Sequence, residues 1–519
     1  MARYLIGMDF GTASVRGVLI DIASGVQLDS AVSDYRNGLI DKRLSDGSRL
    51  PHGSALHMPS DYLVCCQNVL SRLGGNRKIV GIGIAATASS PLPTSANGSL
   101  LVEKYPANSN ALIKLWKHGL AQHHAEQINK KLSVTRPGAS VSGEGLLAKA
   151  LELQIEAPDI WQDAERYIEV GDWLVWQLTG RECRSLDFAC YKALYSYDNG
   201  YPSDEVVPGL SSRVIAPTSV GQVAGYLTEA WLARTGILGD PIVSVASIDS
   251  HAVLPAVSAE FDGTFVGVLG TSSGFLRGGG VPGNVPAGYE AGAYGAALPN
   301  SWCCEAGQAA FGDMLGWFVQ TFPSAGNAEI DFQWYNDQAA MLDAAEGQML
   351  ALDWFGGNRV PFADNALSGL LMGLKITTTP VEIYQALVEC LSFGIKSIIE
   401  RAEVDGYSVE QPILTGTVAL ENPFIVQTIC DVLGRMVNVA DIRFASASGA
   451  AIHAAVASGV ISDFAEGYQR FGCKSFKKFA PNPPRSKIYR DVYPNYLALA
   501  SDPILLHVMR TLSAGFGRT

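Results

Sequence analysis

Residues 4–21, YLIGMDFGTASVRGVLID, decide the fold of this 519-residue chain. The apolar run from Tyr4 to Asp9 predicts a first strand, and the alternation from Val15 to Asp21 predicts a second. The segment Gly11-Thr12-Ala13-Ser14 lies between them. The pattern therefore predicts an antiparallel hairpin with a Gly-Thr tip.

A second unit of the same kind spans Thr264 to Arg277. Residues 265–269 read as its first strand, Gly270 to Gly274 as its tip, and Phe275-Leu276 as the returning strand. The two units lie about half a chain apart, which indicates a weak internal repeat and two similar domains. The strands and helices that alternate elsewhere indicate α/β domains.

The remaining pattern divides the chain into an N-terminal domain (1–246), a C-terminal domain (247–480) and a helical tail (481–519). Helix signals include Thr379-Pro380, a cap followed by proline at the first helical position, and Gly180, which ends a helix. Further strands are expected at 79–86, 241–248, 412–416 and 437–440. Helices are expected at 113–131, 142–153, 172–178, from 380, 422–434 and 449–459.

Bulk composition excludes several classes of protein. Hydrophobic residues make up 48% and charged residues 17%, which excludes a disordered chain or a coiled coil. The net charge is −12, and no Lys/Arg cluster occurs beyond short pairs such as Lys477-Lys478, so a nucleic-acid partner is not expected. The sequence shows neither a signal peptide nor an apolar run long enough to cross a membrane. Nine scattered cysteines without a C-x-x-C pair favour reduced thiols and a cytoplasmic location.

The two Gly-Thr tips are the first chemical signal. Glycine lets backbone N–H groups approach an anion, and the hydroxyls add donors, so two opposed tips would hold a polyphosphate. Asp9 precedes the first tip and would orient Mg²⁺ through water. Either tip alone is also compatible with an ordinary β-turn. The chain contains no P-loop, and no dinucleotide-binding glycine motif follows a strand and opens a helix.

Four further residues have chemical and structural readings that the sequence leaves open. Asp249 ends an apolar strand, where a carboxylate accepts a proton from a substrate hydroxyl or caps a helix. Glu305 faces a ligand or caps an element, and Lys192 lies in a cleft or snorkels to the surface. Gly416 permits a flat group to approach the backbone, or it serves a turn.

These residues resemble the FGGY carbohydrate kinases, most closely the L-ribulokinases, from about Leu5 to Ala457. The most diagnostic match is the run from Leu352 to Arg359, Leu-Asp-Trp-Phe-Gly-Gly-Asn-Arg. Other matching segments are Gly7–Thr12, Leu115–His118, Gly171–Trp173, Tyr191–Tyr195, Ile248–His251, Leu269–Ser272 and Glu305–Asp313.

The resemblance implies two actin-like, ribonuclease-H-like domains with ATP and a sugar in the cleft between them. It implies that Asp249 is the general base that takes the proton from the terminal sugar hydroxyl. Thr12 and Arg16 would neighbour the transferred phosphate, and Asp9 would neighbour Mg²⁺. Homodimers are common in such kinases, so a homodimer is an open expectation.

The resemblance also divides the remaining binding residues between nucleotide and sugar. The nucleotide side would comprise Gly270, Thr271, Gln308, Gly416 and Asn422, with Gly270 and Thr271 at the β- and γ-phosphates and the last two near adenosine. The sugar side would comprise the backbone around Ala88, with Trp116, Lys192 and Glu305.

Four positions depart from the family pattern. Ala85 replaces an aspartate, Gly119 a histidine, Gly145 an aromatic residue, and Thr417 a glycine. Three of these lie on the sugar side, so L-ribulose leads while D-ribulose, xylulose or a related ketose or polyol stays open. A non-catalytic sugar- or nucleotide-binding descendant and a chaperone-like actin-fold ATPase are the alternatives from other classes.

Overall fold

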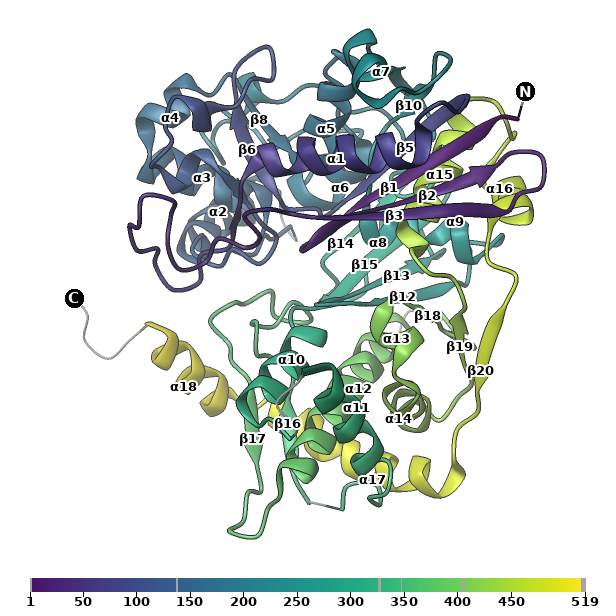
Figure 1. Cartoon of the computed structure of the whole chain (residues 1–519). Coiled ribbons are helices and arrows are strands. Elements are labelled where there is room, and N and C mark those ends of the chain that lie inside the picture. The colour runs from purple at the N-terminus through teal and green to yellow at the C-terminus, as the bar shows by residue number, and fades with distance from the viewer. Residues whose placement is uncertain (1, 137–138, 325–327, 347, 404–406, 515–519) are drawn as a thin grey trace.

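The chain forms two lobes, each built around a seven-stranded mixed sheet (Figure 1). The structure is a computed structural model that describes residues 2–136, 139–324, 328–346, 348–403 and 407–514. The first lobe, at the top of Figure 1, carries the N-terminal strands, and the second lobe carries the later helices. Helices cover both sheets, which confirms the predicted α/β class.

The first sheet begins with the predicted hairpin. β1 (Tyr4–Phe10) pairs antiparallel with β2 (Ser14–Asp21) and parallel with β5 (Ile79–Ala86). The strand order is β3-β2-β1-β5-β10-β9, with β11 beside β5. The further strands are β3 (Gln27–Asp34), β9 (Val223–Tyr226), β10 (Ile242–Ser244) and β11 (Ser247–Ile248).

The second sheet repeats this arrangement. β12 (Phe265–Leu269) pairs antiparallel with β13 (Ser273–Gly278) and parallel with β18 (Ile413–Thr415). Its order is β14-β15-β13-β12-β18-β19-β20. The other strands are β14 (Ala291–Tyr294), β15 (Trp302–Gln308), β19 (Val437–Ala440) and β20 (Phe476–Phe479). The run β3-β2-β1-β5-β10 therefore matches β15-β13-β12-β18-β19, which confirms the internal repeat.

Helices and three two-stranded sheets complete the lobes. The first lobe holds α1 (Pro59–Gly74), α2 (Gln122–Thr135), α3 (Leu146–Glu156), α4 (Pro158–Asp163), α5 (Val170–Thr179), α6 (Leu186–Ala193) and α7 (Glu229–Thr235). The second holds α10 (Gly312–Thr321), α11 (Ala328–Ala339), α12 (Pro380–Glu403), α13 (Thr417–Glu421), α14 (Pro423–Leu433), α17 (Pro483–Ala500) and α18 (Pro503–Ala514). The short pairs are β4 (Leu56–His57) with β7 (Ile113–Lys114), β6 (Pro91–Thr94) with β8 (Arg166–Glu169), and β16 (Leu350–Leu352) with β17 (Leu370–Met372).

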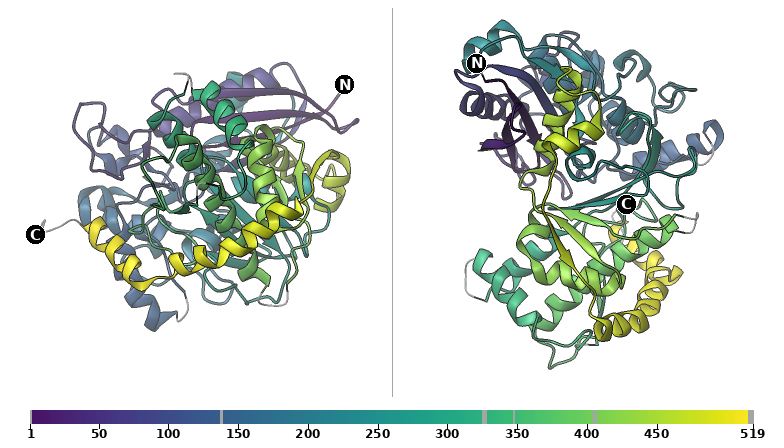
Figure 2. Two further views of the ribbon diagram at one scale, coloured as in Figure 1. Left: turned by 90° about the horizontal axis from the view of Figure 1, so that it is seen from below. Right: turned by 90° about the vertical axis from the view of Figure 1, so that its right-hand side faces the viewer.

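Four helices that follow residue 246 in sequence pack in the first lobe. These are α8 (Asp249–Ala252), α9 (Leu254–Val257), α15 (Ala445–Ala457) and α16 (Phe464–Phe471). α15 lies directly against β1 and β5, since a Cβ added to Gly83 would meet the carbonyl oxygen of Ala450 at 1.8 Å. Figure 2 shows α15 and α16 beside the N-terminal strands in its right view. The chain thus returns to the first lobe between β19 and β20.

Several expected elements differ in their extent. The helix expected over 113–131 is instead the strand β7, a turn through residue 121, and α2 from Gln122. Gly145 caps α3, so this helix begins at Leu146 rather than at residue 142. The strand expected over 241–248 is broken, because the backbone between Ser244 and Ser247 leaves β5, and Asp249 begins α8.

Two helix signals are confirmed, one at the start of α12 and one at the end of α5. α12 begins at Pro380 after Thr379, whose hydroxyl and backbone N–H both contact Glu382 in a capping box. Gly180 ends α5 in the left-handed conformation. α17 and α18 form the expected helical tail and cross the second lobe, as seen from below in Figure 2.

All nine cysteines are buried, and no disulfide joins them in the part of the chain that the structure describes. No helix among the described residues is long and apolar enough to cross a membrane.

Candidate active site

A large cavity of about 1690 Å³ lies between the two lobes and is lined by residues of both. Both Gly-Thr tips line it, at Gly11-Thr12 and Gly270-Thr271. The repeat places the tips at equivalent ends of β1 and β12, so they face one cavity from two lobes. We refer to this cavity as the cleft.

Hydrogen bonds from other elements fix both tips. The indole N–H of Trp116 donates to the hydroxyl of Thr12 at 3.1 Å. The backbone N–H groups of Phe311 and Gly312, at the start of α10, donate to the carbonyl oxygens of Thr271 and Gly270 at 2.9 Å each. The two tips are therefore preorganised rather than free turns.

Two carboxylates line the cleft together with the tips. Asp9 and Asp249 both line the cleft, and the guanidinium of Arg16 lies 3.4 Å from one oxygen of Asp9. Burial, together with the charge of Asp249, raises the pKa of Asp9 to about 7, although Arg16 acts in the opposite direction. Burial likewise raises the pKa of Asp249 above its usual range. The two carboxylates are therefore close enough for the charge of Asp249 to disfavour ionisation of Asp9.

Asp249 is the first residue of α8, and its Oδ1 accepts the backbone N–H of Ser250 at 2.8 Å. Ile248 caps this helix with its extended backbone, so Asp249 is not the N-cap residue. Among the described residues, none hydrogen-bonds to the other carboxylate oxygen, so this oxygen can receive a ligand in the cleft. A half-buried carboxylate of raised pKa in this position is suited to accept a proton from a substrate hydroxyl.

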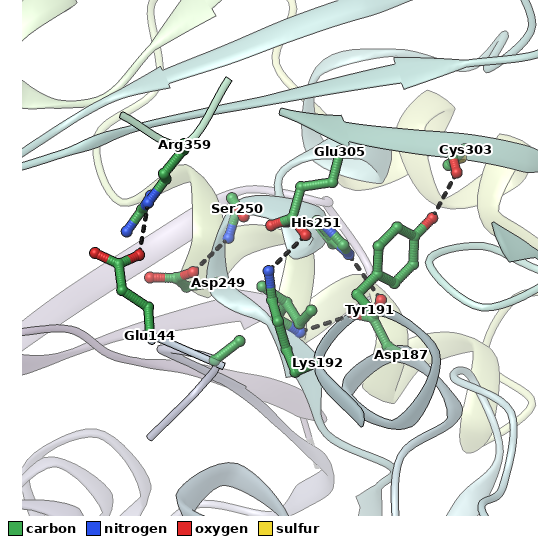
Figure 3. A network of polar contacts seen from close by, with 12 residues as sticks. Glu144, Asp187, Tyr191, Lys192, Asp249, Ser250, His251, Cys303, Glu305 and Arg359 are labelled. Carbon is green, nitrogen blue, oxygen red and sulfur yellow. Dashed lines mark hydrogen bonds and ion pairs between the residues drawn. The ribbon is translucent and has the colours of Figure 1, made fainter. Parts of the chain in front are cut away.

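A second group of charges lines the cleft on either side of Asp249 (Figure 3). The ammonium of Lys192, on α6, lies 2.5 Å from an oxygen of Glu305, on β15. The guanidinium of Arg359 lies 2.9 Å from Glu144, ahead of α3. Both pairs join the first lobe to the second. Carboxylates and cations in alternation offer acceptors and donors to a ligand with several hydroxyl groups.

Electrostatics keep the Lys192–Glu305 pair ionised. Burial alone would raise the pKa of Glu305, but Lys192 and then His251 hold it well below its usual range. Burial would lower the pKa of Lys192, but Glu305 raises it above its ordinary value. Lys192 therefore does not snorkel to solvent; its side chain is only 11% exposed.

The opposite end of the cleft is shaped by the segment after β18. Gly416 has φ +93°, and a Cβ there would lie 2.4 Å from the carbonyl oxygen of Leu269. Only glycine fits this close approach of two backbones. Asn422 lines the same end, and its amide is held by Asn336 at 2.7 Å and by the Val418 carbonyl at 3.1 Å.

The structure brings twelve of the thirteen predicted site residues to the cleft. These are Asp9, Thr12, Arg16, Ala88, Trp116, Lys192, Asp249, Gly270, Thr271, Glu305, Gly416 and Asn422. Gln308 is not among them. Its amide is buried behind β15, where it accepts from Ser273 and donates to Asp353 and to the Leu391 carbonyl. Strand residues alternate in facing, so Gln308 points away from the side that Glu305 occupies.

Sequence reasoning missed Glu144 and Arg359 as site residues. Arg359 ends the diagnostic run from Leu352, and this place in the motif was the available signal. For Glu144 the only signal was that the next residue, Gly145, departs from the family pattern. Their contact joins residues 215 positions apart, which no local pattern predicts.

One departure from the family pattern, at Ala85, has a structural reason. Ala85 is fully buried and packs with Ala252 and Ala450, where α15 closes on β5, so the structure has no room for a carboxylate. Thr417 is exposed and lines the cleft beside Gly416. A Cβ on Gly119 would meet no atom within 4 Å, so nothing around it requires glycine.

The described residues contain no cluster of three or more His, Cys, Asp or Glu side chains that would hold a metal ion by themselves. Asp9 nevertheless suits a divalent cation. Its Oδ1 is buried without a hydrogen-bond partner, and it faces the cleft where two tips converge. Mg²⁺ is usually held by one or two carboxylates together with substrate phosphates, and a single free carboxylate oxygen fits that mode.

Comparison with known proteins identifies the family. The model of the FGGY family of carbohydrate kinases, C-terminal domain, matches residues 265–458. A ribulokinase from Bacillus licheniformis is 33% identical over 94% of each chain. The chain belongs to the FGGY family of carbohydrate kinases. A ribulokinase from Mycolicibacterium smegmatis is 32% identical and covers 98% of this chain and 97% of its own.

Solved structures of the family show the same fold. The xylulose kinase from Rhodospirillum rubrum aligns with a TM-score of 0.79 over 98% of this chain and all of its own, at 19% identity. This match confirms the prediction of two actin-like domains. Membership of a carbohydrate kinase family makes this chain a sugar kinase that uses ATP, with a sugar and ATP as its small-molecule substrates.

Proposed function

We propose that this chain is an ATP-dependent pentulose kinase that converts L-ribulose to L-ribulose 5-phosphate by phosphorylating the terminal hydroxyl. The observation that carries the proposal is the place of Asp249. It lies in the cleft that both Gly-Thr tips line, with the Lys192–Glu305 and Arg359–Glu144 pairs on either side of it. The ribulokinase relatives, which match over nearly the full chain, support the choice of substrate.

Asp249 acts as the general base in this proposal. The terminal hydroxyl of the sugar donates to the free carboxylate oxygen and loses its proton as its oxygen attacks the γ-phosphorus of ATP. The bond from that phosphorus to the β–γ bridging oxygen breaks, and ADP leaves. The raised pKa of Asp249 makes the carboxylate a stronger base than an exposed aspartate. The remaining catalysis consists of positioning and charge stabilisation.

The two tips would cradle the phosphates of ATP. Backbone N–H groups and hydroxyls at Gly270-Thr271 suit the β- and γ-phosphates, while Thr12 and Arg16 suit the phosphoryl group in transfer. Gly416 and Asn422 would lie near adenosine. Gln308 has no place in this assignment, because its amide is buried behind β15.

Asp9 would hold Mg²⁺, through its unpartnered buried oxygen. The ion would supply charge neutralisation at the phosphates when bound. Its charge would also offset the repulsion between Asp9 and Asp249, which otherwise favours protonation of one of them.

A coupled ADP-release assay over a panel of pentuloses and pentitols tests the proposal. We expect L-ribulose to give the highest kcat/KM. We expect Asp249→Asn to abolish phosphoryl transfer while calorimetry still detects sugar binding. Turnover that no sugar stimulates would reject the kinase proposal, and unchanged turnover in Asp249→Asn would reject the role of the base.

Two alternatives remain measurable in the same assay. A different preferred ketose, such as D-ribulose or xylulose, would follow from the departures at Ala85, Gly119 and Gly145. A sugar-binding descendant without activity would follow from Ala85 and Thr417, and calorimetry would then show sugar binding without ATP binding.

We also propose the division into a sugar-binding N-terminal domain (1–246), a nucleotide-binding C-terminal domain (247–480) and a tail (481–519). This division in sequence differs from the division into lobes. The helices α8, α9, α15 and α16 follow residue 246 in sequence but pack on the first lobe. We further propose a cytoplasmic homodimer, which light scattering coupled to size-exclusion chromatography tests.

A further inference from the structure

Asp187 is fully buried on α6, and its carboxylate makes two contacts with the segment that carries Asp249. One oxygen accepts the backbone N–H of Ile248 at 2.9 Å. The other contacts Nδ1 of His251 at 2.7 Å. Asp249 lies between these two points in the sequence, so a single carboxylate fixes the backbone before it and the side chain after it.

His251 continues the contact to the second lobe. Its Nε2 lies 3.6 Å from an oxygen of Glu305, beyond hydrogen-bond range but close enough for an ion pair. The ring of Tyr191 packs edge-on against the imidazole at 4.5 Å, and the Tyr191 hydroxyl donates to the Cys303 carbonyl at 2.8 Å. The imidazole of His251 therefore lies between the carboxylates of Asp187 and Glu305 and has no exposure to solvent.

These contacts complete a chain of alternating charge. Asp187, His251, Glu305 and Lys192 follow one another across the cleft wall, and Asp187 and Lys192 lie five positions apart on the same helix (Figure 3). Although burial would lower it, the charge of Asp187 and then that of Glu305 raises the pKa of His251 to about 9. The imidazole is therefore cationic at neutral pH.

We propose that Asp187 and His251 form a buried positioning pair that sets both the base Asp249 and the sugar-binding carboxylate Glu305. Neither residue lines the cleft, so neither touches substrate. Asp187 acts on Asp249 through the backbone of residues 248–251, and His251 acts on Glu305 through its charge. The inference rests on the proposed function, because it assigns these residues to a phosphoryl transfer by Asp249.

Asp187→Asn removes the charge and one acceptor but keeps the volume. We expect kcat to fall by about 100-fold, the loss that a displacement of about 1 Å of a reacting group produces. Asp172→Asn is the matched control. Asp172 is a buried carboxylate on α5 that accepts the Ser185 N–H at 2.9 Å and does not line the cleft. The control should retain wild-type kcat.

His251→Asn separates the two roles. Asparagine keeps a donor near the Nδ1 position, and hence the Asp187 contact, but places nothing beside Glu305. We expect the KM for the sugar to rise about tenfold or more, while kcat falls less than in Asp187→Asn. A change that only loosened the fold would not produce this division between KM and kcat.

The pH profile provides a second readout. The charged or titratable groups that face His251 are Asp187, Tyr191 and Lys192 from α6, Glu305 from β15 and Asp249 beside it in α8. In the wild type, kcat/KM should fall above about pH 9 as His251 loses its proton. Asp187→Asn leaves burial to dominate, so this limb should move to lower pH by about 1 to 3 units. It should stay in place in Asp172→Asn.

The outcomes separate this inference from the proposed function. A wild-type chain without sugar-dependent ADP release refutes the proposed function. An active wild type whose Asp187→Asn variant keeps both kcat and the pH limb refutes the positioning pair alone. If Asp187→Asn does not fold, as judged by thermal unfolding, His251→Asn decides the matter: unchanged sugar KM overturns the inference, and a raised KM with smaller loss of kcat supports it.

Discussion

Removal of Lys192 should destabilise the chain and weaken sugar binding together. Its ammonium lies 2.5 Å from Glu305, and the two side chains are only 11% and 9% exposed. Loss of one partner of a buried ion pair costs about 3–5 kcal/mol, because the other charge is left without compensation. Glu305 keeps His251 at 3.6 Å, so we expect Lys192→Met to lie at the lower end, near about 3 kcal/mol.

The thermal assay has a defined scale. The unfolding entropy is about 2.1 cal/mol/K per residue, so for this chain about 3 kcal/mol corresponds to a fall in Tm of about 3 °C. Glu305→Gln should produce a similar fall. The double variant should lose less than the two single losses combined, because neither charge remains buried alone. In parallel, each single variant should raise the KM for the sugar in the coupled ADP-release assay.

An exposed ion pair provides the matched control. Arg72 lies 2.7 Å from Asp29, with side chains that are 60% and 27% exposed. Exposed pairs contribute about 0–1 kcal/mol, so Arg72→Met should shift Tm by less than about 1 °C. The reasoning is refuted if Lys192→Met shifts Tm no more than Arg72→Met, or if the losses in the double variant are fully additive.

Three further predictions concern Mg²⁺, the nucleotide and the sugar pocket. Because the pKa of Asp9 is raised to about 7, protons compete with Mg²⁺ below that pH; the Mg²⁺ midpoint for activity should rise as pH falls from 8 to 6, and a constant midpoint would exclude Asp9. Gly416→Ala should raise the KM for ATP at saturating sugar, because the new Cβ would lie 2.4 Å from a carbonyl oxygen of β12; an unchanged KM would contradict this. Lys149, fully buried, donates to the carbonyl oxygens of Ser89 at 2.7 Å and Leu115 at 2.6 Å. Lys149→Met should therefore raise the KM for the sugar and leave that for ATP unchanged, and the reverse pattern would argue against a role on the sugar side.

The parts of the fold that the sequence predicts are those encoded by neighbouring residues. The hairpin of residues 4–21 needs only alternation and a glycine tip, and the start of α12 needs only Thr379, Pro380 and Glu382. The turn that carries Trp116 is different. It forms where residues 113–121 break from a helical pattern because the Leu115 N–H bonds to the Ala55 carbonyl at 2.9 Å, 60 positions away. Helical periodicity in that stretch carries no information about this contact.

The site shows the same limit. Asp9, Asp249 and both tips are found from strand ends and glycines, since these features are local. Glu144, and its contact with Arg359, are found only when the two lobes meet. The family resemblance assigns Gln308 to the nucleotide, whereas alternation along β15 sends its amide to the face opposite Glu305. Strand parity alone would have separated the two residues.

Ala85 replaces the aspartate of the family pattern and so removes one negative charge near Asp9 and Asp249. It lies opposite Asp9 on β1 and Ser247 on β11, so an aspartate there would stand beside two carboxylates that already repel each other. Each further negative charge in a buried site raises the pKa of its neighbours. Alanine adds no such charge, and its small side chain lets α15 pack against β5. In the proposed assignment the chain keeps two carboxylates at this point, Asp9 for the cation and Asp249 for the proton, which differ in the partners that each one has.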